Sequence, residues 1–301
     1  FGPYEPNVVR YSKPRRGNLP GFLLLAAPSL RFSRQRFISS LSFDSSSQVS
    51  LWERLRRRVR YSTADCRIYA IGDVHGCFPL LVKLLQLIEI DQREREPMET
   101  HVVLLGDYID RGPQSRDVCE LLYAMRDSAY FHCLMGNHEE TMLKVLDGNR
   151  MALRFWLQYG GEETLLSWGV ERDLVERAPL SEGGQWQVIE AFRERVSPAL
   201  TEWMRNLRSH HRHGDYLFAH AGVRPRLKLE EQSEEDMRWI REPFLSSNAK
   251  HPWRVVHGHS QTDSAEILHN RIGIDTGAYR TGMLTAIGIE DDDAWPIVAA
   301  G

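Results

Sequence analysis

Three short apolar runs that each end at a glycine constrain the fold of this chain more than any other feature. They occupy residues 67–71, 101–105 and 130–135 and stop at Gly72, Gly106 and Gly136. Apolar residues at helical spacing separate them, at positions 80, 81, 84, 85 and 88 and again at 118, 121, 122 and 125. This βαβαβ pattern predicts three neighbouring parallel strands with their glycine loops together at the carboxyl ends, where ligand sites of such sheets form.

The remainder of the chain continues with helices and then returns to strands. Residues 141–210 are rich in apolar and aromatic groups typical of helices and predict a helical insertion beside the site. Four β-prone runs follow at 216–219, 254–256, 271–274 and 284–289. The first three run into His220, His257 and Asp275, and the fourth closes the sheet. We therefore expect one α/β domain over residues 61–301.

Residues 1–60 differ in charge from the rest of the chain. They carry 12 Lys and Arg against 3 Asp and Glu, whereas the other residues carry 26 against 38. Frequent Arg, Ser and Pro without a hydrophobic period predict a poorly ordered segment with no catalytic residue. It is a removable targeting segment, an arm that binds nucleic acid or lipid, or sequence foreign to the native protein. The first methionine, Met98, lies beyond the first glycine loop and favours the last interpretation.

Composition excludes several classes of protein. The four cysteines show no Cys-x-x-Cys spacing, so a disulfide scaffold is not expected. No run of about 18 apolar residues occurs, which excludes a membrane span. The formal charge of -3 and the acidic body argue against nucleic acid as the partner. We expect a cytoplasmic protein without a membrane or nucleic-acid partner.

The strand ends carry side chains that bind metals. Each glycine loop carries two such residues: Asp73 and His75 in the first, Asp107 and Asp110 in the second, and Asn137 and His138 in the third. Two later strand ends add His220 and His259. Oxygen and imidazole donors without a thiolate suit a pair of Mn, Fe or Zn ions better than a structural zinc. In an extended segment, the side chains of Asp73 and His75 point the same way and reach one ion. Asp107 is the candidate to bridge two ions about 3.5–4 Å apart.

The motifs in this order resemble the phosphoprotein phosphatase group of the calcineurin-like metallophosphoesterases. The pattern is Gly-Asp-x-His-Gly, Gly-Asp-x-x-Asp-Arg-Gly, Gly-Asn-His-Glu, His-Ala-Gly and a late Gly-His, over about residues 66–300. The resemblance implies a two-sheet β-sandwich flanked by helices in αββα layers. Compact bacterial and bacteriophage protein phosphatases and symmetrical dinucleoside tetraphosphatases look most similar. Asp110 and Glu139 resemble the protein phosphatases, although the Ser-Ala-Pro-Asn-Tyr segment of the eukaryotic enzymes is absent from the sequence.

The resemblance also implies site roles. Asp73 and His75 would hold the first ion, Asn137, His220 and His259 the second, and Asp107 would bridge them. His138 would be the proton donor, oriented by Asp110. Arg111 and Arg241 would bind the phosphate oxygens. The implied cofactors are two divalent ions, with Mn²⁺ preferred and Fe or Zn as options.

The resulting hypothesis is a Ser/Thr phosphoprotein phosphatase in which a metal-bridging hydroxide attacks phosphorus in one step. The alternative is a symmetrical bis(5'-nucleosyl)-tetraphosphatase that converts diadenosine tetraphosphate to ADP, with residues 156–161 covering a nucleotide. A non-catalytic scaffold of the same fold is the third possibility. The expected partner is a phosphorylated protein or a dinucleoside polyphosphate.

The other histidines have no predicted direct role. His210, His211 and His213 lie near a predicted helix end and are expected to be solvated. The other group is expected to be isolated and comprises His101, His132, His251 and His269. His257 supports His259. Tyr279 either lines the substrate cleft or is an exposed loop aromatic.

Overall fold

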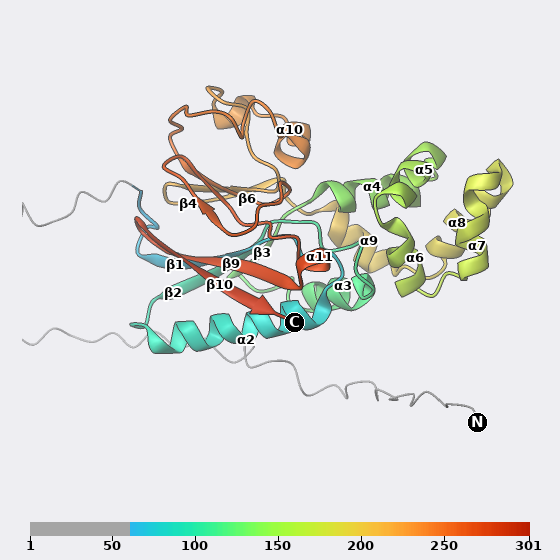
Figure 1. Ribbon diagram of the computed structural model, residues 1–301, viewed down its shortest axis with the longest axis horizontal. Helices are drawn as coiled ribbons and strands as arrows, with labels where there is room; N and C mark the ends of the chain where they lie inside the picture. Colours follow the sequence, from blue (N-terminus) through green and yellow to red (C-terminus); the bar gives the residue numbers. More distant parts are fainter. Residues whose placement is uncertain (1–60) are drawn as a thin grey trace, which may run out of the picture. The chain divides into compact units, whose positions relative to one another are not determined.

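The computed structural model describes residues 61–301, so the predictions for residues 1–60 lie outside the described residues. The described strands form two five-stranded sheets (Figure 1). The first has the order β10-β9-β1-β2-β3, with β1 (Cys66–Ile71), β2 (Glu99–Leu104), β3 (Phe131–Cys133), β9 (Met283–Glu290) and β10 (Asp293–Ala300). The parallel pairing of β1, β2 and β3 confirms the βαβαβ prediction.

The second sheet has the order β4-β5-β6-β8-β7. Its strands are β4 (His210–His213), β5 (Tyr216–Ala219), β6 (Arg254–His257), β7 (Glu266–Ile267) and β8 (Arg271–Gly273). The three central strands β5, β6 and β8 are parallel, and the edge strands β4 and β7 are antiparallel to their neighbours. The residues that follow β5 and β6 therefore leave this sheet at the same end.

Helices cover the outer faces of the two sheets. α2 (Phe78–Glu94) packs on β9 and β10, and α3 (Ser115–Ala124) connects β2 to β3. α10 (Glu234–Trp239) lies on the other side of the sandwich, above the second sheet (Figure 1). α11 (Ala278–Thr281) and two short 3-10 helices, η2 (Ala178–Leu180) and η3 (Leu229–Glu231), complete the connections. The two-sheet αββα sandwich implied by the resemblance is thus confirmed.

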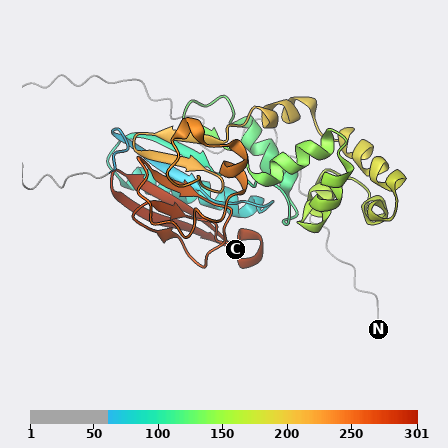
Figure 2. The same cartoon turned by 90° about the horizontal axis from the view of Figure 1, so that it is seen from above.

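Six α-helices, with η2 among them, follow one another between β3 and β4. They are α4 (Asn137–Leu146), α5 (Arg150–Gln158), α6 (Gly161–Ser167), α7 (Arg172–Arg177), α8 (Glu182–Arg193) and α9 (Pro198–Arg205). Figure 2 shows this helical segment to one side of both sheets. Its first helix begins directly at the third glycine loop, so the segment borders the end of the sandwich that carries the strand-end side chains.

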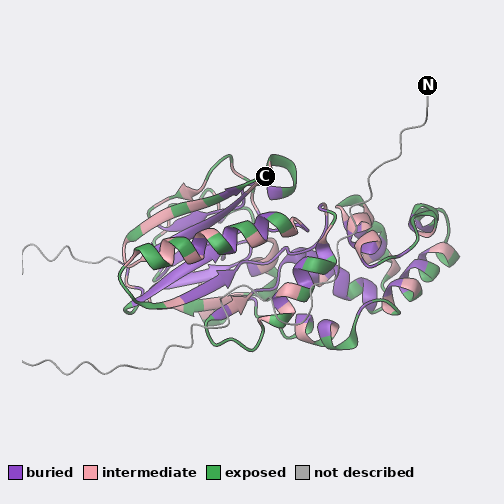
Figure 3. Ribbon diagram, turned by 90° about the horizontal axis from the view of Figure 1, so that it is seen from below, coloured by how far each residue is buried: buried purple, intermediate pink, exposed green. Residues whose placement is uncertain are grey.

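The main core lies between the two sheets. Ile68 and Ala70 of β1 and Val103 of β2 face Phe218, Val256 and Ile272 of the second sheet, and all are fully buried. The intervening residues point outward, where Leu217 and Val255 pack with Ile240 and Phe244 beneath the α10 region. Figure 3 shows the buried strands behind a partly exposed helix. Within residues 61–301, no helix has both the length and the apolar character needed to cross a membrane.

Candidate active site

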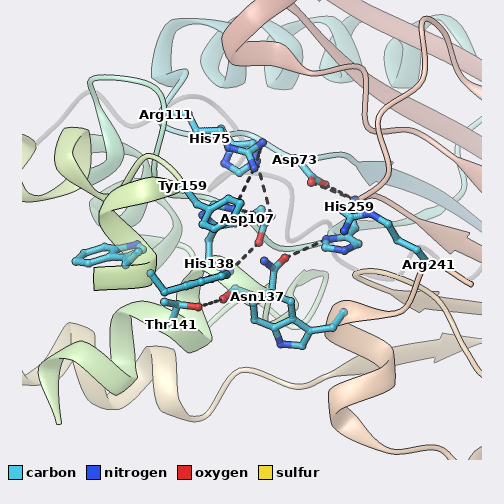
Figure 4. Close-up of a pocket in the computed structure, with 13 residues that line it drawn as sticks. Asp73, His75, Asp107, Arg111, Asn137, His138, Thr141, Tyr159, Arg241 and His259 are labelled. Carbon is cyan, nitrogen blue, oxygen red and sulfur yellow. Dashed lines mark hydrogen bonds and ion pairs between the residues drawn. The ribbon is translucent and has the colours of Figure 1, made fainter. Parts of the chain in front are cut away.

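The predicted site residues come together at one end of the sandwich. They border a cavity of about 220 Å³, and eight of the ten candidates line it (Figure 4): Asp73, His75, Asp107, Arg111, Asn137, His138, Arg241 and His259. The other two, Asp110 and His220, are fully buried directly behind it. The segments that follow β1, β2 and β3 therefore meet the segments that follow β5 and β6 at this end of the sandwich.

Asp107 lies at the centre of this constellation. Its Oδ2 is 3.7 Å from Nε2 of His75 and 3.7 Å from Nε2 of His138, whereas Oδ1 is 3.4 Å from Nε2 of His220. Two sets of potential ligand atoms share this carboxylate, one with His75 and His138 and one with His220 and His259. Each of its oxygens therefore faces a different group of imidazoles.

The second group converges on an amide oxygen. Oδ1 of Asn137 lies 2.8 Å from Nε2 of His220 and 3.0 Å from Nδ1 of His259. Nε2 of His259 is buried and has no hydrogen-bond partner among the described residues. Buried polar atoms normally have partners, so this unpaired nitrogen indicates a place for a ligand that the protein atoms do not supply.

Burial and neighbouring charges set unusual pKa values here. Burial and the nearby Asp275 carboxylate raise the pKa of Asp73 well above its ordinary value. Burial also opposes ionisation of Asp107, but the surrounding imidazoles, His220 first, outweigh it and hold the Asp107 pKa well below its usual range. Burial lowers the pKa of His75 well below its ordinary value. The site thus gathers carboxylates and a neutral imidazole that favour a cation.

The backbone of the loops is strained around the cavity. Nine described non-glycine residues have positive φ, and five belong to this site: His75 (45°), Asp107 (50°), Asp110 (74°), Arg111 (67°) and His259 (59°). Such conformations cluster at functional sites because the surrounding structure must hold them. The prediction of an extended Asp73-x-His75 segment is wrong, since β1 ends at Ile71 and the chain turns at His75.

Glu139 holds the loop that follows β2 to the loop that follows β3. Its carboxylate is fully buried and accepts hydrogen bonds from the backbone N–H groups of Asp107 (2.9 Å), Tyr108 (2.8 Å) and Gly136 (3.0 Å). The last of these caps helix α4. Gly136 must be small, because a Cβ there would lie 2.2 Å from Oδ1 of Asp107. Glu139 and Gly136 therefore fix the position of Asp107.

We predict that Glu139→Gln lowers the free energy of unfolding by about 1–3 kcal/mol, because the new amide NH₂ faces backbone N–H donors and leaves one unpaired. Chemical denaturation measures this change. Glu120→Gln is the matched control, since Glu120 is an exposed carboxylate paired with Arg116 on α3, and we expect its effect to stay within about 0.5 kcal/mol. Equal effects of the two substitutions would contradict the fastening role.

His138 is held by a buried carboxylate. Its Nδ1 lies 2.5 Å from Oδ2 of Asp110, and its Nε2 faces the cavity beside Asp107. The same Oδ2 of Asp110 accepts a hydrogen bond from Nε1 of Trp156 (2.6 Å), and Oδ1 accepts one from Oγ1 of Thr164 (2.5 Å). Burial opposes protonation of His138, but the Asp107 and Asp110 carboxylates outweigh it and raise the His138 pKa.

The contacts of Trp156 and Thr164 with Asp110 are features that sequence reasoning missed. The tetraphosphatase alternative predicted that residues 156–161 cover a nucleotide; Trp156 of this segment lines the cavity and is buried, with its indole N–H directed at Asp110. Both residues lie on helices of the segment between β3 and β4, 46 and 54 positions from Asp110. No local sequence signal connects positions so far apart.

Two arginines approach the cavity from different segments. Nη1 of Arg111 lies 3.1 Å from Nε2 of His75, and Nη2 lies 3.3 Å from Nε2 of His138. The guanidinium also lies 4.8 Å from the centre of the Tyr279 ring, so Tyr279 borders the site. Arg241 follows α10 and lines the opposite wall. Two guanidinium groups around one cavity suit an anion with several oxygens.

Aromatic side chains form a further wall, of which sequence reasoning pointed only to Tyr159, within residues 156–161. Phe155, Tyr159 and Trp239 line the cavity, and Phe155 and Tyr159 are 41% and 48% exposed. The ring centroid of Phe155 lies 4.4 Å from that of Tyr159 and 6.2 Å from that of Trp239. This wall can contact an apolar or planar part of a bound molecule next to the charged residues.

Comparison with known proteins adds a family and a fold. The model of the calcineurin-like phosphoesterase family matches residues 66–282. The serine/threonine-protein phosphatase 1 of Salmonella typhimurium is 29% identical over 231 residues, which cover 74% of this chain and 92% of that protein. A symmetrical bis(5'-nucleosyl)-tetraphosphatase of Nitrosospira multiformis is 25% identical, covering 74% and 93%. The crystal structure of a putative diadenosine tetraphosphatase has the same fold, with a TM-score of 0.55, 19% identity and coverage of 79% and 96%.

Proposed function

Because this chain belongs to the calcineurin-like phosphoesterase family, we propose that it is a dinuclear-metal phosphomonoester hydrolase that acts on phosphoserine and phosphothreonine in proteins. The observation that carries the proposal is the position of Asp107, whose two oxygens face two separate sets of donors. A carboxylate shared in this way is what a pair of ions needs as a bridge.

Members of the family use divalent metal ions, and the donors present fit such ions. Asp73 and His75 would hold the first ion, Asn137, His220 and His259 the second, and Asp107 both. The unpaired Nε2 of His259 and the close carboxylates of Asp73 and Asp107 support this assignment. Oxygen and imidazole donors favour Mn²⁺, with Fe or Zn as options. When bound, the ions would activate a water molecule and neutralise charge on the phosphoryl group.

The chain's own residues bind the phosphate and supply the proton. Arg111 and Arg241 donate hydrogen bonds to the phosphoryl oxygens from opposite walls. His138 gives the proton on Nε2 to the departing serine or threonine oxygen, and Asp110 stabilises the imidazolium through Nδ1. Trp156 and Thr164 act as positioning residues, because they hold the Asp110 carboxylate toward His138.

We predict that Trp156→Phe lowers kcat about fivefold with little change in KM, since one hydrogen bond to Asp110, worth roughly 1 kcal/mol, is lost. Trp168→Phe, a buried tryptophan of the same helical segment that packs on Phe192, is the control and should leave kcat unchanged. In a His138→Gln background, Trp156→Phe should have no further effect on kcat. Additive losses in the double variant would show that Trp156 acts through something other than His138.

Asp110 and Glu139 support a protein substrate over a dinucleotide, because both residues resemble the protein phosphatase pattern. A symmetrical dinucleoside tetraphosphatase is the second candidate, and the aromatic wall of Phe155, Tyr159 and Trp239 favours it, since a nucleobase can stack there. In either case the catalytic domain of this proposal spans residues 61–301, with residues 141–210 as a helical insertion that supplies Phe155 and Tyr159 of this wall, whereas Trp239 comes from α10.

A side-by-side assay of the manganese-loaded full chain tests the proposal. A phosphothreonine peptide and diadenosine tetraphosphate are compared under the same conditions, with Asp107→Asn as the inactive reference. We expect faster release of phosphate from the peptide. Faster conversion of the dinucleotide to two ADP would transfer the assignment to the tetraphosphatase, and bound manganese without turnover of either substrate would reject an enzyme of this class.

A further inference from the structure

Several histidines lie between the two sheets at the edge where β3 and β4 lie. They are His101 of β2, His132 of β3, and His211 and His213 of β4. Within their own sheets, His101 pairs with Ile68, His132 with Val103, His211 with Phe218 and His213 with Tyr216, and all four partners belong to the inter-sheet core. Directly paired residues of neighbouring strands point to the same face. These imidazoles therefore occupy core-facing positions.

The four rings form one contact cluster. Ring centroids are 5.3 Å apart for His101 and His132, 4.0 Å for His132 and His211, and 4.6 Å for His101 and His213. Nδ1 of His101 lies 3.0 Å from Nε2 of His132. The prediction that His101 and His132 are isolated is wrong, and His211 and His213 are half-buried rather than solvated.

A cysteine and a carboxylate complete the cluster. Cys66, the first residue of β1, is buried and pairs with Glu99, the first residue of β2. Sγ of Cys66 and one ring nitrogen each of His101 and His213 lie within 4.8 Å of one another. Oε1 of Glu99 lies 3.1 Å from Nε2 of His101. These residues begin β1 and β2, whereas the active site lies at the opposite, carboxyl ends of the same strands.

We propose that Cys66, His101 and His213 form a second metal site, separate from the active site, that binds a thiophilic transition-metal cation, Zn²⁺ above all. One thiolate and two imidazoles are donors that zinc prefers, and they are poor ligands for Mn²⁺ or Mg²⁺. Donors of one tetrahedral zinc stand about 3.3–3.6 Å apart, so a small closure of the three side chains is sufficient. Glu99 adds negative charge at the rim.

The site connects the two sheets. Cys66 and His101 belong to the first sheet and His213 to the second, so a bound ion would cross-link β1 and β2 to β4. A ligand that binds only the folded chain stabilises it. Zinc should therefore raise the melting temperature of the wild-type chain, and should do so also in Asp107→Asn, whose active site is disabled.

Cobalt is the sharpest probe, because a cobalt–thiolate bond gives an intense near-ultraviolet charge-transfer band that nitrogen and oxygen ligands do not give. The metal-free full chain is titrated with Co²⁺ and followed by absorbance. We expect the final intensity of the band to correspond to one cobalt–thiolate centre per chain, both in the wild type, whose active site takes up further cobalt without adding to the band, and in Asp107→Asn. Cys66→Ser should abolish the band, and His213→Gln should weaken cobalt affinity at least about tenfold.

Cys77→Ser is the matched control, since Cys77 is the cysteine beside the active site, with its Sγ 3.4 Å from the carbonyl oxygen of His75. It should keep the band. Absence of the band in the wild type would overturn the proposal, whatever the phosphatase assays give. Persistence of the band in Cys66→Ser, or its loss in Cys77→Ser, would also overturn it. Because His213 lies on an edge strand and is half-buried, its variant still reports if Cys66→Ser does not fold.

Discussion

Replacing Asp107 with asparagine is expected to lower phosphate release at least about 10²–10³-fold, the loss that follows removal of a central electrostatic group from an active site. It should also reduce the manganese bound per chain below two ions. The substitution keeps the size of the side chain. The hydrogen bond from the backbone N–H of His138 to Oδ1 of Asp107 (3.1 Å) can be retained, so the fold should persist.

The reason for the large effect is charge rather than shape. The imidazoles around Asp107 keep its carboxyl ionised despite burial, and an amide cannot supply that charge to two ions. Metal content after gel filtration and initial rates on a phosphothreonine peptide measure the two effects. Asp117→Asn, on the exposed side of α3, is the control and should behave as the wild type. A variant at position 107 that retained both ions and full turnover would refute the bridging role.

Replacing His138 with asparagine is expected to lower kcat by about 10²–10⁴-fold, the range for loss of a general acid, while both ions remain bound. The loss should depend on the leaving group. A serine or threonine alkoxide needs a proton, whereas p-nitrophenolate leaves without one, so p-nitrophenyl phosphate should suffer a much smaller loss. Comparing kcat on the two substrates separates proton donation from a general disturbance of the site.

The matched control for this experiment is His269→Asn, because His269 is an exposed histidine of the second sheet's periphery. Its kcat on both substrates should equal that of the wild type. If His138→Asn lowered turnover of both substrates equally, the imidazole would serve phosphate binding or metal placement instead. If it left kcat unchanged, another residue would be the proton donor.

The sequence predicts the part of the site that follows from local patterns. Apolar runs that stop at Gly72, Gly106 and Gly136 identify parallel strands, and parallel strands necessarily bring Asp73, Asp107 and Asn137 to one edge. The same rule applied to β5 and β6 brings His220 and His259 to one end of the second sheet, whereas the meeting of the two groups depends on how the two sheets pack, which only the family resemblance implied. What the structure adds is their arrangement around Asp107 and the fastening of that residue by Glu139.

The features that sequence reasoning missed have physical causes. β4 escaped detection because imidazoles occupy its core-facing positions, so its pattern reads as polar. β10 contains Pro296, which normally argues against a strand, but β10 pairs only with β9 and an edge strand tolerates proline. The bonds from Trp156 and Thr164 to Asp110 depend on how α5 and α6 pack, which no local pattern encodes.

The measurement that tests the central claim most directly is a manganese titration of the metal-free full chain, with bound metal and phosphate release from a phosphothreonine peptide recorded on the same samples. A pair of ions sharing Asp107 predicts that activity reaches its maximum when two manganese ions are bound per chain and is lost on chelation. Full activity with a single bound ion, or activity that survives complete removal of metal, would contradict it.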